Sequence, residues 1–414
     1  MTTDTPAGAL AGLKVLDLSR VLAGPWCTQV LADLGADVVK VERPGSGDDT
    51  RHWGPPFLKD VEGKDTDQAT YFTTCNRNKR SVTIDMAKPE GQALIRQMAL
   101  QSDILVENFK VGGLQQYGLD YESLKAINPR LIYCSITGFG QDGPYAERAG
   151  YDLLIQASSG MMSITGRADN EPGGGGVRVG VALTDLFAGV YASTAILAAV
   201  QARHRTGLGQ RVDMALLDVG MAILANQAAG FLNTGDVPQR QGNSHPSLAP
   251  YQDFPTADGA MLLAIGNDGQ FARFCQAVDR AEWATDPRFA TNTQRVLHRQ
   301  ILIPAMEAVT RTRSTADWVK LFEDKAVPCG PINNLAQAFD DPQVRARGLR
   351  VDLTRDAGDG VTSIASVASP LRLSEAPAVL RYAPPALGQH TNEVLREIGL
   401  DAAAIEALKN AGVV

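Results

Sequence analysis

The sequence is poor in the residues that mark disulfide-rich and metal-binding proteins. Its 414 residues include 5 cysteines and 5 histidines, and no two cysteines form a Cys-x-x-Cys pair. An odd, scattered set of cysteines favours buried thiols in a reducing compartment over a disulfide framework. The histidines form no His-Glu-x-x-His or similar ligand pattern. We therefore expect no metal site, and we take the cytoplasm as the expected location.

Charge and hydropathy argue against two further classes of protein. There are 39 Lys and Arg residues against 46 Asp and Glu residues, and no dense basic run, so nucleic-acid binding is not expected. The longest uncharged apolar run, 186–200, is short for a bilayer span and contains Gly189, Ser193 and Thr194, which favours a buried core helix. The first ten residues lack the basic residue and apolar core of a signal peptide. We expect neither a membrane nor a nucleic acid as partner.

Several familiar catalytic and nucleotide-binding motifs are also missing. There is no Gly-x-Ser-x-Gly sequence and no Walker phosphate loop. Residues 13–18 and 37–42 are typical of strands, with a helix predicted between them at 25–35, which makes a strand–helix–strand unit. The turn after the first strand contains one glycine, Gly24, where a dinucleotide-binding turn needs three. The pattern therefore predicts a Rossmann-like topology without a nicotinamide cofactor.

What the chain does contain is a long alternation of strand and helix patterns. Further strands are predicted at 81–84, 103–107, 131–136 and 210–214, and further helices at 89–100, 121–127, 152–162 and 215–231. This order predicts an α/β fold with a parallel sheet.

The composition changes after residue 232. The segment 233–251 is rich in Gly, Pro, Asn and Ser, and a turn, a strand at 261–265 and three helical patterns follow it. We expect a large Rossmann-like domain formed first by residues 1–224, a smaller α+β domain at 225–330, and a return to the large domain over 331–414.

One carboxylate, Asp185, stands between a loop and an apolar helix pattern. Four glycines, 173–176, precede it, followed by a β-branched segment, 177–181, that predicts a strand. The local pattern favours Asp185 as a helix N-cap. Free N–H groups and the helix dipole at such a position keep a carboxylate ionised, so Asp185 is also a candidate nucleophile. The glycines favour a mobile loop, and a role in shielding a reactive intermediate from water stays open.

Four groups of residues carry a resemblance to a known family. They are residues 12–25, 34–44, 78–81 with Asp85, and 106–109. In this order they resemble the class III coenzyme A-transferases. That family includes formyl-CoA transferase, carnitine CoA-transferase and the succinyl-CoA-dependent dicarboxylate transferases, and the α-methylacyl-CoA racemases are close relatives. The similarity extends from about residue 13 to residues 388–391, nearly the whole chain.

The resemblance implies an interlocked homodimer of ring-like subunits that uses CoA as a co-substrate and holds no tightly bound cofactor. It places the family's nucleophilic aspartate at Asp185. The positions that contact CoA fall on Leu22, Ala23, Arg43, Ile84 and the residues up to Ala87, Asn108, Phe109 and the neighbourhood of Arg148.

Three positions depart from the formyl-CoA type. Leu22 stands where that type has glutamine, Ala87 where it has lysine, and Gln116 where it has arginine. Two cations that would contact CoA phosphates are therefore missing, and Lys88 is a candidate replacement for one of them.

Tyr151 separates two activities within the superfamily. The racemases carry a His-Asp pair after an Ala-Gly, whereas here Ala149 and Gly150 are followed by Tyr151 and Asp152. Tyrosine, with a pKa of about 10, is a poor base for removing an α-proton at neutral pH. The resemblance therefore favours a CoA-transferase over a racemase-like isomerase, and a non-catalytic CoA-binding protein stays open as a further alternative.

The implied reaction moves CoA from an acyl-CoA donor to a free acid through an aspartyl anhydride and an aspartyl-CoA thioester on Asp185. Gly242, Asn243 and His245 lie in a Gly-Asn-Ser-His-Pro segment that replaces the substrate loop of the formyl-CoA type, and with Tyr151 they are candidates for contact with the acceptor. Similar Asn-x-His-Pro sequences occur in transferases for larger acids. We expect succinyl-CoA or a similar donor and a dicarboxylic acceptor, while His245 as a solvated loop residue stays equally open.

Overall fold

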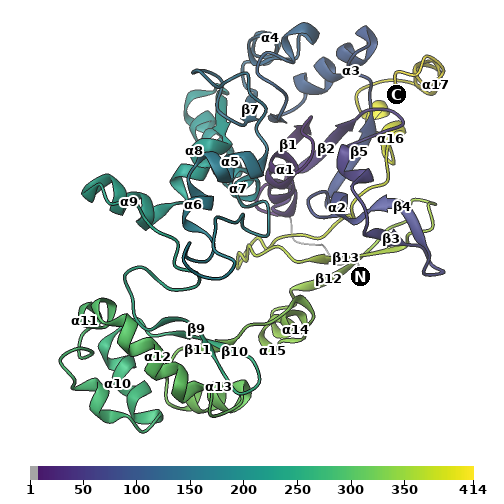
Figure 1. The fold of residues 1–414 in the computed structure, drawn as a ribbon. Coiled ribbons are helices and arrows are strands. Elements are labelled where there is room, and N and C mark those ends of the chain that lie inside the picture. Colours follow the sequence, from purple (N-terminus) through teal and green to yellow (C-terminus); the bar gives the residue numbers. More distant parts are fainter. Residues whose placement is uncertain (1–7) are drawn as a thin grey trace. The chain divides into compact units, whose positions relative to one another are not determined.

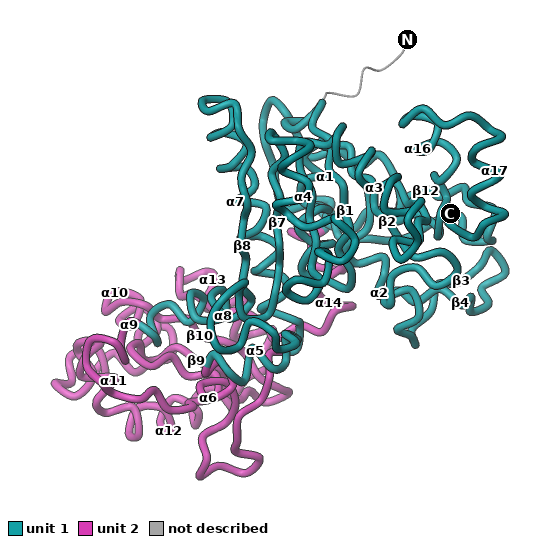
Figure 2. Tube along the Cα trace, turned by 90° about the horizontal axis from the view of Figure 1, so that it is seen from above, with its two compact units in different colours: residues 1–159, 180–228, 345–414 teal, residues 160–179, 229–344 magenta. Residues whose placement is uncertain are grey.

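The computed structural model describes residues 8–414, which form two compact units (Figures 1 and 2). Unit 1 comprises 8–159, 180–228 and 345–414, and unit 2 comprises 160–179 and 229–344. The small unit thus takes up a segment ahead of the predicted boundary at 225 and continues beyond 330. Residues 160–179 join unit 2 through contacts with residues that are distant in the sequence. One of these contacts is the hydrogen bond from the Gly242 N–H to the Gly166 carbonyl at 3.0 Å.

Unit 1 is built on a six-stranded parallel sheet. Across the sheet the strands are β5 (Lys79–Thr83), β2 (Asp37–Glu42), β1 (Lys14–Asp17), β6 (Ile104–Glu107), β7 (Ile132–Thr137) and β8 (Arg211–Ala215). Every neighbouring pair runs parallel. Numbered along the chain, the order is 3-2-1-4-5-6, the order of dinucleotide-binding folds, and the direction of winding reverses between β1 and β6. The predicted α/β fold with a parallel sheet is confirmed.

Helices cover both faces of this sheet (Figure 1). They are α1 (Ala23–Asp33), α3 (Pro89–Leu100), α4 (Tyr121–Ile127), α5 (Asp152–Ser158), α7 (Leu183–Thr206), α8 (Leu216–Ala222), α16 (Thr391–Glu397) and α17 (Ala402–Asn410). Successive strand residues point to opposite faces. Accordingly, Val15 belongs to one apolar cluster with residues of α1 and α7, and Leu16 belongs to a second cluster with residues of α3, α4, α16 and α17.

Shorter elements complete unit 1. They are the antiparallel pairs β3 (Phe57–Lys59) with β4 (Asp65–Ala69) and β12 (Arg350–Thr354) with β13 (Ser363–Val367), helix α2 (Thr70–Thr73), and the 3-10 helices η1 (Asp49–His52) and η2 (Gln115–Tyr117). The C-terminal part of the chain is tied to the sheet by Arg80, which forms ion pairs with Glu393 at 2.8 Å and Glu397 at 2.7 Å. Both ends of the chain therefore build this unit.

Unit 2 is a small α+β structure with its own core. Its antiparallel sheet has the order β11 (Cys329–Pro331), β10 (Ala260–Ala264) and β9 (Tyr251–Pro255). Its helices are α6 (Met161–Ile164), α10 (Asp268–Ala277), η3 (Ala281–Ala284), α11 (Asn292–Leu297), α12 (Arg299–Thr310), α13 (Thr315–Asp324) and α14 (Leu335–Asp340). Helices α9 (Ala225–Thr234) and α15 (Pro342–Ala346) span the limits between the units. Buried aromatic side chains, among them Phe274, Trp318 and Phe322, fill the core.

Two predicted helices are interrupted. The helix predicted over 152–162 ends at Ser158, and Gly160, with a φ of 86°, separates α5 from α6. The helix predicted over 215–231 is broken at Ala225, whose φ is 47°. Residues in the left-handed region end a right-handed helix, and apolar periodicity alone does not reveal them.

The strand predicted over 177–181 is wrong. These residues have no strand conformation, and the Val177 N–H donates to the Thr165 carbonyl at 3.0 Å. A β-branched segment becomes a strand only where a neighbouring strand pairs with it.

Helix α7 carries Asp185 and packs against α1, β7 and β8. Its length and apolar composition alone are sufficient to cross a membrane, and its buried residues belong to the unit 1 core. Gly189 lets α1 and α7 approach closely, since a Cβ there would lie 2.7 Å from the Ala23 carbonyl oxygen and 3.0 Å from the Trp26 Cβ. The start of α1 is thereby fixed beside the helix that carries Asp185.

We predict that Gly189→Ala lowers the free energy of unfolding by about 1–3 kcal/mol, because the added methyl group meets the backbone of α1. Chemical denaturation measures the change. Gly230→Ala is the matched control, since Gly230 also lies in a helix but nothing lies within 4 Å of an added Cβ. There the greater helix propensity of alanine predicts no loss, or a gain of up to about 1 kcal/mol. Equal destabilisation by both variants contradicts the close-approach account.

Candidate active site

Two cavities lie where loops follow the strands of the unit 1 sheet. Cavity 1, of about 240 Å³, is formed by the loops after β1, β6 and β7 together with Asp185. It is lined by 20–23, 108–111, 136–138, 148–151, Asp49, Trp53, Ala146, Asp185 and Leu216. This is the edge and the switch point at which open α/β sheets bind ligands.

Cavity 2, of about 570 Å³, lies beside the ends of β2 and β5. Its lining includes 40–43, 46–49, 84–87, Gln116 and Tyr117. Arg20, Asp49, Phe109 and Lys110 line both cavities. The two cavities are therefore adjoining parts of one groove.

Asp185 is the third residue of α7, and the N-cap position belongs to Ala182. The carboxylate that caps this helix is Asp152, which accepts hydrogen bonds from the Thr184 N–H at 2.8 Å and the Thr184 hydroxyl at 2.7 Å. The predicted N-cap role of Asp185 is therefore wrong. The cap comes from α5, more than thirty residues earlier, so the local sequence around α7 does not contain it.

The electrostatic surroundings of Asp185 favour its neutral form. Burial raises the pKa of Asp185 to about 7, with the Asp152 carboxylate as a second cause. Burial and a like charge thus oppose the ionised form that the start of a helix is expected to favour. Burial also raises the pKa of the Tyr71 phenol, and Asp185 adds to that increase, so a neutral phenol lies within electrostatic reach of the carboxylate. A carboxyl group with a pKa near 7 changes its protonation state easily at neutral pH.

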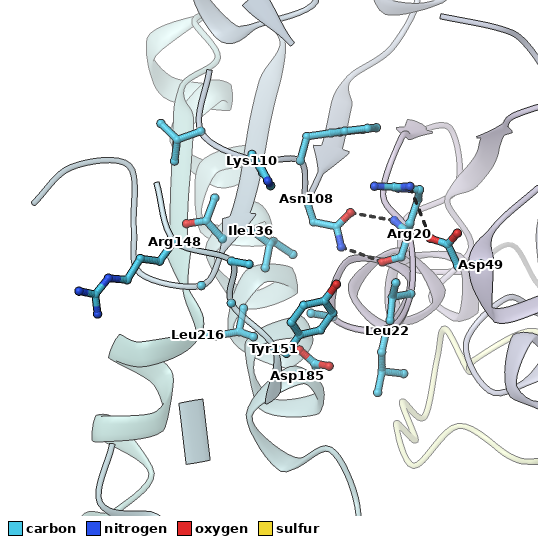
Figure 3. A pocket seen from close by; sticks show the side chains of 18 of the residues that line it. Arg20, Leu22, Asp49, Asn108, Lys110, Ile136, Arg148, Tyr151, Asp185 and Leu216 are labelled. Carbon is cyan, nitrogen blue, oxygen red and sulfur yellow. Dashed lines mark hydrogen bonds and ion pairs between the residues drawn. The ribbon is translucent and has the colours of Figure 1, made fainter. Parts of the chain in front are cut away.

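Figure 3 shows how the side chains of cavity 1 are directed. The Lys110 ammonium points into the cavity, and the Tyr151 ring lies between Asn108 and Asp185. The side chain of Arg148 points away from the cavity and stacks on the Tyr145 ring at 3.7 Å. Of these cations, Lys110 is thus better placed than Arg148 to contact a ligand.

The loop that carries Tyr151 is held against the end of β7 by two glycines. A Cβ on Gly138 would lie 2.4 Å from the Cα of Gly150, and a Cβ on Gly150 would lie 2.1 Å from the Cα of Gly138. The two backbones are therefore in direct contact. This contact fixes one wall of cavity 1.

The structure gathers the predicted CoA-contacting residues, together with Tyr151, Asp185 and the altered position Gln116, from distant parts of the chain. Leu22, Ala23, Asn108, Phe109, Arg148, Tyr151 and Asp185 line cavity 1, and Arg43, Ile84, Ala87, Phe109 and Gln116 line cavity 2. Lys88 lines neither cavity. Its ammonium donates to the carbonyls of Ala411 at 2.5 Å and Gly412 at 2.9 Å.

The predicted substrate-loop residues Gly242 and Asn243 lie in unit 2, where they line a separate cavity of about 840 Å³. The His245 ring lies against Tyr251, with ring centroids 5.3 Å apart, and its Nδ1 accepts from the Ser247 N–H at 3.0 Å. The glycines 173–176 also belong to unit 2 and are mostly exposed.

Several residues of the site escaped the sequence analysis as candidates. Arg20, Trp53, Lys110, Asp152 and Tyr71 line cavity 1 or act on Asp185. Three of them have a sequence signal. Arg20 lies within the segment 12–25, and Lys110 and Asp152 directly follow Phe109 and Tyr151. Trp53 and Tyr71 lie in no motif, and only the fold brings them to the site.

Residues 8–414 offer little support for a catalytic thiol or a metal site. Four cysteines are buried, and burial raises the pKa of the thiols of Cys75 and Cys275 to about 12, which disfavours a reactive thiolate. Within the same range, no group of three His, Cys, Asp or Glu residues is arranged to hold a metal ion.

The raised pKa of Asp185 predicts a specific dependence of stability on pH. The unfolded chain ionises this group near pH 4, whereas the folded protein ionises it near pH 7, so the wild type loses stability as the pH rises between these values. Asp185→Asn removes this loss. The free energy of unfolding of Asp185→Asn relative to the wild type therefore increases between about pH 4 and pH 7 and is constant above that range. The increase is a few kcal/mol at most, since one pKa unit is worth about 1.4 kcal/mol.

Denaturant titrations at a series of pH values measure this difference. Asp258→Asn is a control of opposite sign, because the Thr315 N–H lowers the pKa of Asp258. That variant loses stability relative to the wild type as the pH rises from below the usual aspartate pKa up to that value, and the difference is constant at higher pH. An Asp185→Asn difference that does not change with pH contradicts the raised pKa.

Comparison with known proteins identifies the family. A family model described as CoA-transferase family III matches residues 10–391. The chain is 50% identical over 389 residues to the succinate–glutarate CoA-transferase of Agrobacterium fabrum, covering 94% of this chain and 95% of that protein. It is 43% identical over 409 residues to the succinyl-CoA:glutarate CoA-transferase of Homo sapiens, covering 98% and 90%.

Among solved structures, a CAIB/BAIF family protein from Brucella suis matches with a TM-score of 0.83 and 48% identity, covering 95% of this chain and 100% of that chain. Sequence and structure agree over nearly the whole length. The chain therefore belongs to CoA-transferase family III.

Proposed function

We propose that this CoA-transferase moves CoA from succinyl-CoA, or a similar acyl-CoA, to a free dicarboxylic acid, with Asp185 as the nucleophile. The observation that carries the mechanism is a partly buried carboxylate in the lining of cavity 1, whose pKa burial raises to about 7. The substrate class rests on the relatives, whose names pair succinyl-CoA or succinate with glutarate.

The two adjoining cavities suit the two ends of CoA. We assign the nucleotide to the larger cavity 2 and the thioester to cavity 1, where Asp185 lies. Arg43 lines cavity 2, and Arg20 and Lys110 line both, so these three cations supply positive charge for the CoA phosphates. They compensate for the uncharged Ala87 and Gln116 in cavity 2.

The first half-reaction forms two covalent intermediates on Asp185. A carboxylate oxygen attacks the acyl carbon of the thioester, the C–S bond breaks, and an aspartyl anhydride and CoA thiolate result. The thiolate then attacks the aspartyl carbonyl carbon. The bond from that carbon to the bridging oxygen breaks, and the donor acid leaves with this oxygen.

The second half-reaction is the reverse with a different acid. A carboxylate oxygen of the acceptor attacks the aspartyl thioester and expels the thiolate, which gives the acceptor anhydride. The thiolate attacks the acceptor carbonyl, and Asp185 returns as a free carboxylate. No proton is taken from carbon and no water is consumed in either half-reaction. The site therefore needs a nucleophile, and it has to keep water away from the covalent intermediates.

The neighbours of Asp185 adjust its reactivity. Asp152 fixes the start of α7 and raises the pKa of Asp185, so the ionised carboxylate is poorly stabilised by its surroundings and reacts readily. The Lys110 ammonium points into cavity 1, where negative charge develops on the oxyanion and the thiolate.

The lining of the cavities favours transfer over racemisation. None of the histidines within residues 8–414 lines cavity 1 or cavity 2. A base for the α-proton would have to be a tyrosine such as Tyr151, and a phenol is a poor base for that step at neutral pH.

We also propose that the enzyme is a homodimer. Unit 1 exposes large apolar side chains on two packed helices, namely Phe187, Val190 and Tyr191 of α7 and Leu153 and Leu154 of α5. A patch of this kind, close to the catalytic carboxylate, is typical of a surface that a second subunit covers. Light scattering is expected to give twice the chain mass of 44.1 kDa.

We predict that Asp185→Asn abolishes exchange of labelled succinate into succinyl-CoA, because an amide does not form the anhydride. Asp218→Asn is the matched control, since Asp218 is also the third residue of its helix but lines neither cavity. Label exchange followed by mass spectrometry is expected to lose at least about a thousandfold in rate for the first variant and to stay near wild type for the second. Exchange retained by Asp185→Asn removes this residue as the nucleophile.

We further predict that glutarate is a much better acceptor than pentanoate, which has the same chain length but lacks the distal carboxylate. A site that binds this group rejects the analogue by about a hundredfold or more in kcat/KM, because its polar partners stay unpaired. Initial rates with succinyl-CoA and each acid measure the ratio. Equal rates contradict a dicarboxylate-specific enzyme while leaving CoA transfer itself intact.

A further inference from the structure

Val21, in the wall of cavity 1, has an unusual backbone conformation. Its φ is 70°, in the left-handed region. Branching at Cβ makes this region costly for valine, and such residues persist only where their surroundings hold them. Neighbouring groups therefore have to hold the turn.

A buried ion pair fixes the peptide groups on both sides of Arg20. The Val21 N–H lies 3.3 and 3.2 Å from the two carboxylate oxygens of Asp48. Asp48 pairs with the Lys40 ammonium at 2.9 Å, and both side chains are fully buried. Lys40 also donates to the Ser19 carbonyl at 2.7 Å.

The pair stays charged despite its burial. Burial alone would raise the pKa of Asp48, but Lys40 and the hydrogen bonds from Thr50 lower it below its usual range. Burial alone would lower the pKa of Lys40, but Asp48, Asp17 and Glu42 raise it above its usual range. The bond to the Val21 N–H is thus charge-assisted.

Asn108 supplies a further clamp from the loop after β6. Its side-chain oxygen accepts from the Arg20 N–H at 2.8 Å, and its amide donates to the Arg20 carbonyl at 2.7 Å (Figure 3). Asn108 holds Arg20, whereas Asp48 holds the strained residue that follows.

The turn decides where the next residues lie. Leu22 and Ala23 follow Val21 directly and line cavity 1 together with Asp185. Ala23 begins α1, and its carbonyl faces Gly189 of α7. With an extended Val21, the chain would enter α1 in a different direction.

We propose that Asp48, paired with Lys40, is a positioning residue that holds Val21 in its left-handed conformation and thereby places Leu22 and Ala23 beside Asp185 for CoA transfer. This inference rests on the proposed function, because it assigns a task to residues that support the same site. It accounts for a buried ion pair, and for a strained valine, that the covalent mechanism does not use.

Val21→Gly distinguishes a positioning role of Asp48 from direct contact between Asp48 and CoA. Lys40 and Asp48 also line cavity 2, so replacing them could weaken CoA binding by contact alone. Glycine adopts positive φ without strain. If Asp48 acts through Val21, then Val21→Gly compensates for its loss, whereas a direct contact to CoA is not restored.

The test compares kcat, KM for succinyl-CoA and thermal stability among variants of Lys40, Asp48 and Val21. Lys40→Met with Asp48→Ala removes both charges, so no unpaired charge stays buried. It is expected to lower kcat by about tenfold to a hundredfold, because misplacing site residues by about 1 Å has effects of that size. Adding Val21→Gly is expected to recover at least about threefold of that loss. Val21→Gly alone is the reference for this recovery, because Val21 itself lines cavity 1.

Asp33→Asn is the matched control. Asp33 forms another buried ion pair in unit 1, with Arg77 at 2.6 Å, and the polar partners of its side chain are Arg77 and Asn78 rather than residues 19–22. It is expected to lower stability with little change in kcat, and Val21→Gly should not rescue it. Asp48→Asn, which keeps the shape of the side chain, provides the same comparison if the double replacement does not fold.

The proposal is overturned if the charge-free variant keeps a kcat near that of wild type, or if Val21→Gly restores nothing. Calorimetric titration with CoA gives the same ordering of variants without turnover. Wild-type protein that binds CoA but transfers none would refute the proposed function, while the CoA affinities of the variants would still decide whether Asp48 positions Val21.

Discussion

The hydrogen bonds from Thr184 to Asp152 are the interaction on which the active site depends. They begin α7 at the point where Asp185 faces cavity 1, and they bring a second carboxylate near it. Burial and this like charge raise the pKa of Asp185 to about 7. The contact with Asp152 thus positions the Asp185 carboxylate. It also leaves the ionised form of Asp185 weakly stabilised, and a weakly stabilised carboxylate is a better nucleophile toward a thioester.

The parallel sheet supplies the rest of the site. Because all six strands run in one direction, the loops after β1, β6 and β7 meet at one edge, where the winding of the chain reverses. Two close backbone approaches turn this edge into a defined groove. Gly189 allows α7 to lie against the start of α1, and the contact of Gly138 with Gly150 fixes the loop of Tyr151.

The parts of the protein that repeat a regular pattern were predictable from the sequence. Alternating strands and helices predicted the parallel sheet, and family motifs led to Asp185 and to the residues that line both cavities. Features in which tertiary contacts override local preference were not predictable from the sequence. Asp152 caps a helix that begins 31 residues later, and the propensities of valine argue against the left-handed conformation of Val21. Segment 160–179 joins the small unit only through distant contacts.

The central claim is that the carboxylate of Asp185 itself becomes part of the intermediates, and oxygen labelling tests it most directly. In each turnover, one oxygen of the acceptor carboxylate becomes the bridging oxygen of the anhydride and stays on Asp185 when the acyl-CoA product forms. After turnover with ¹⁸O-labelled glutarate and succinyl-CoA, mass spectrometry of the peptide that contains Asp185 should show ¹⁸O in this side chain. Complete turnover without label in Asp185 would contradict the account.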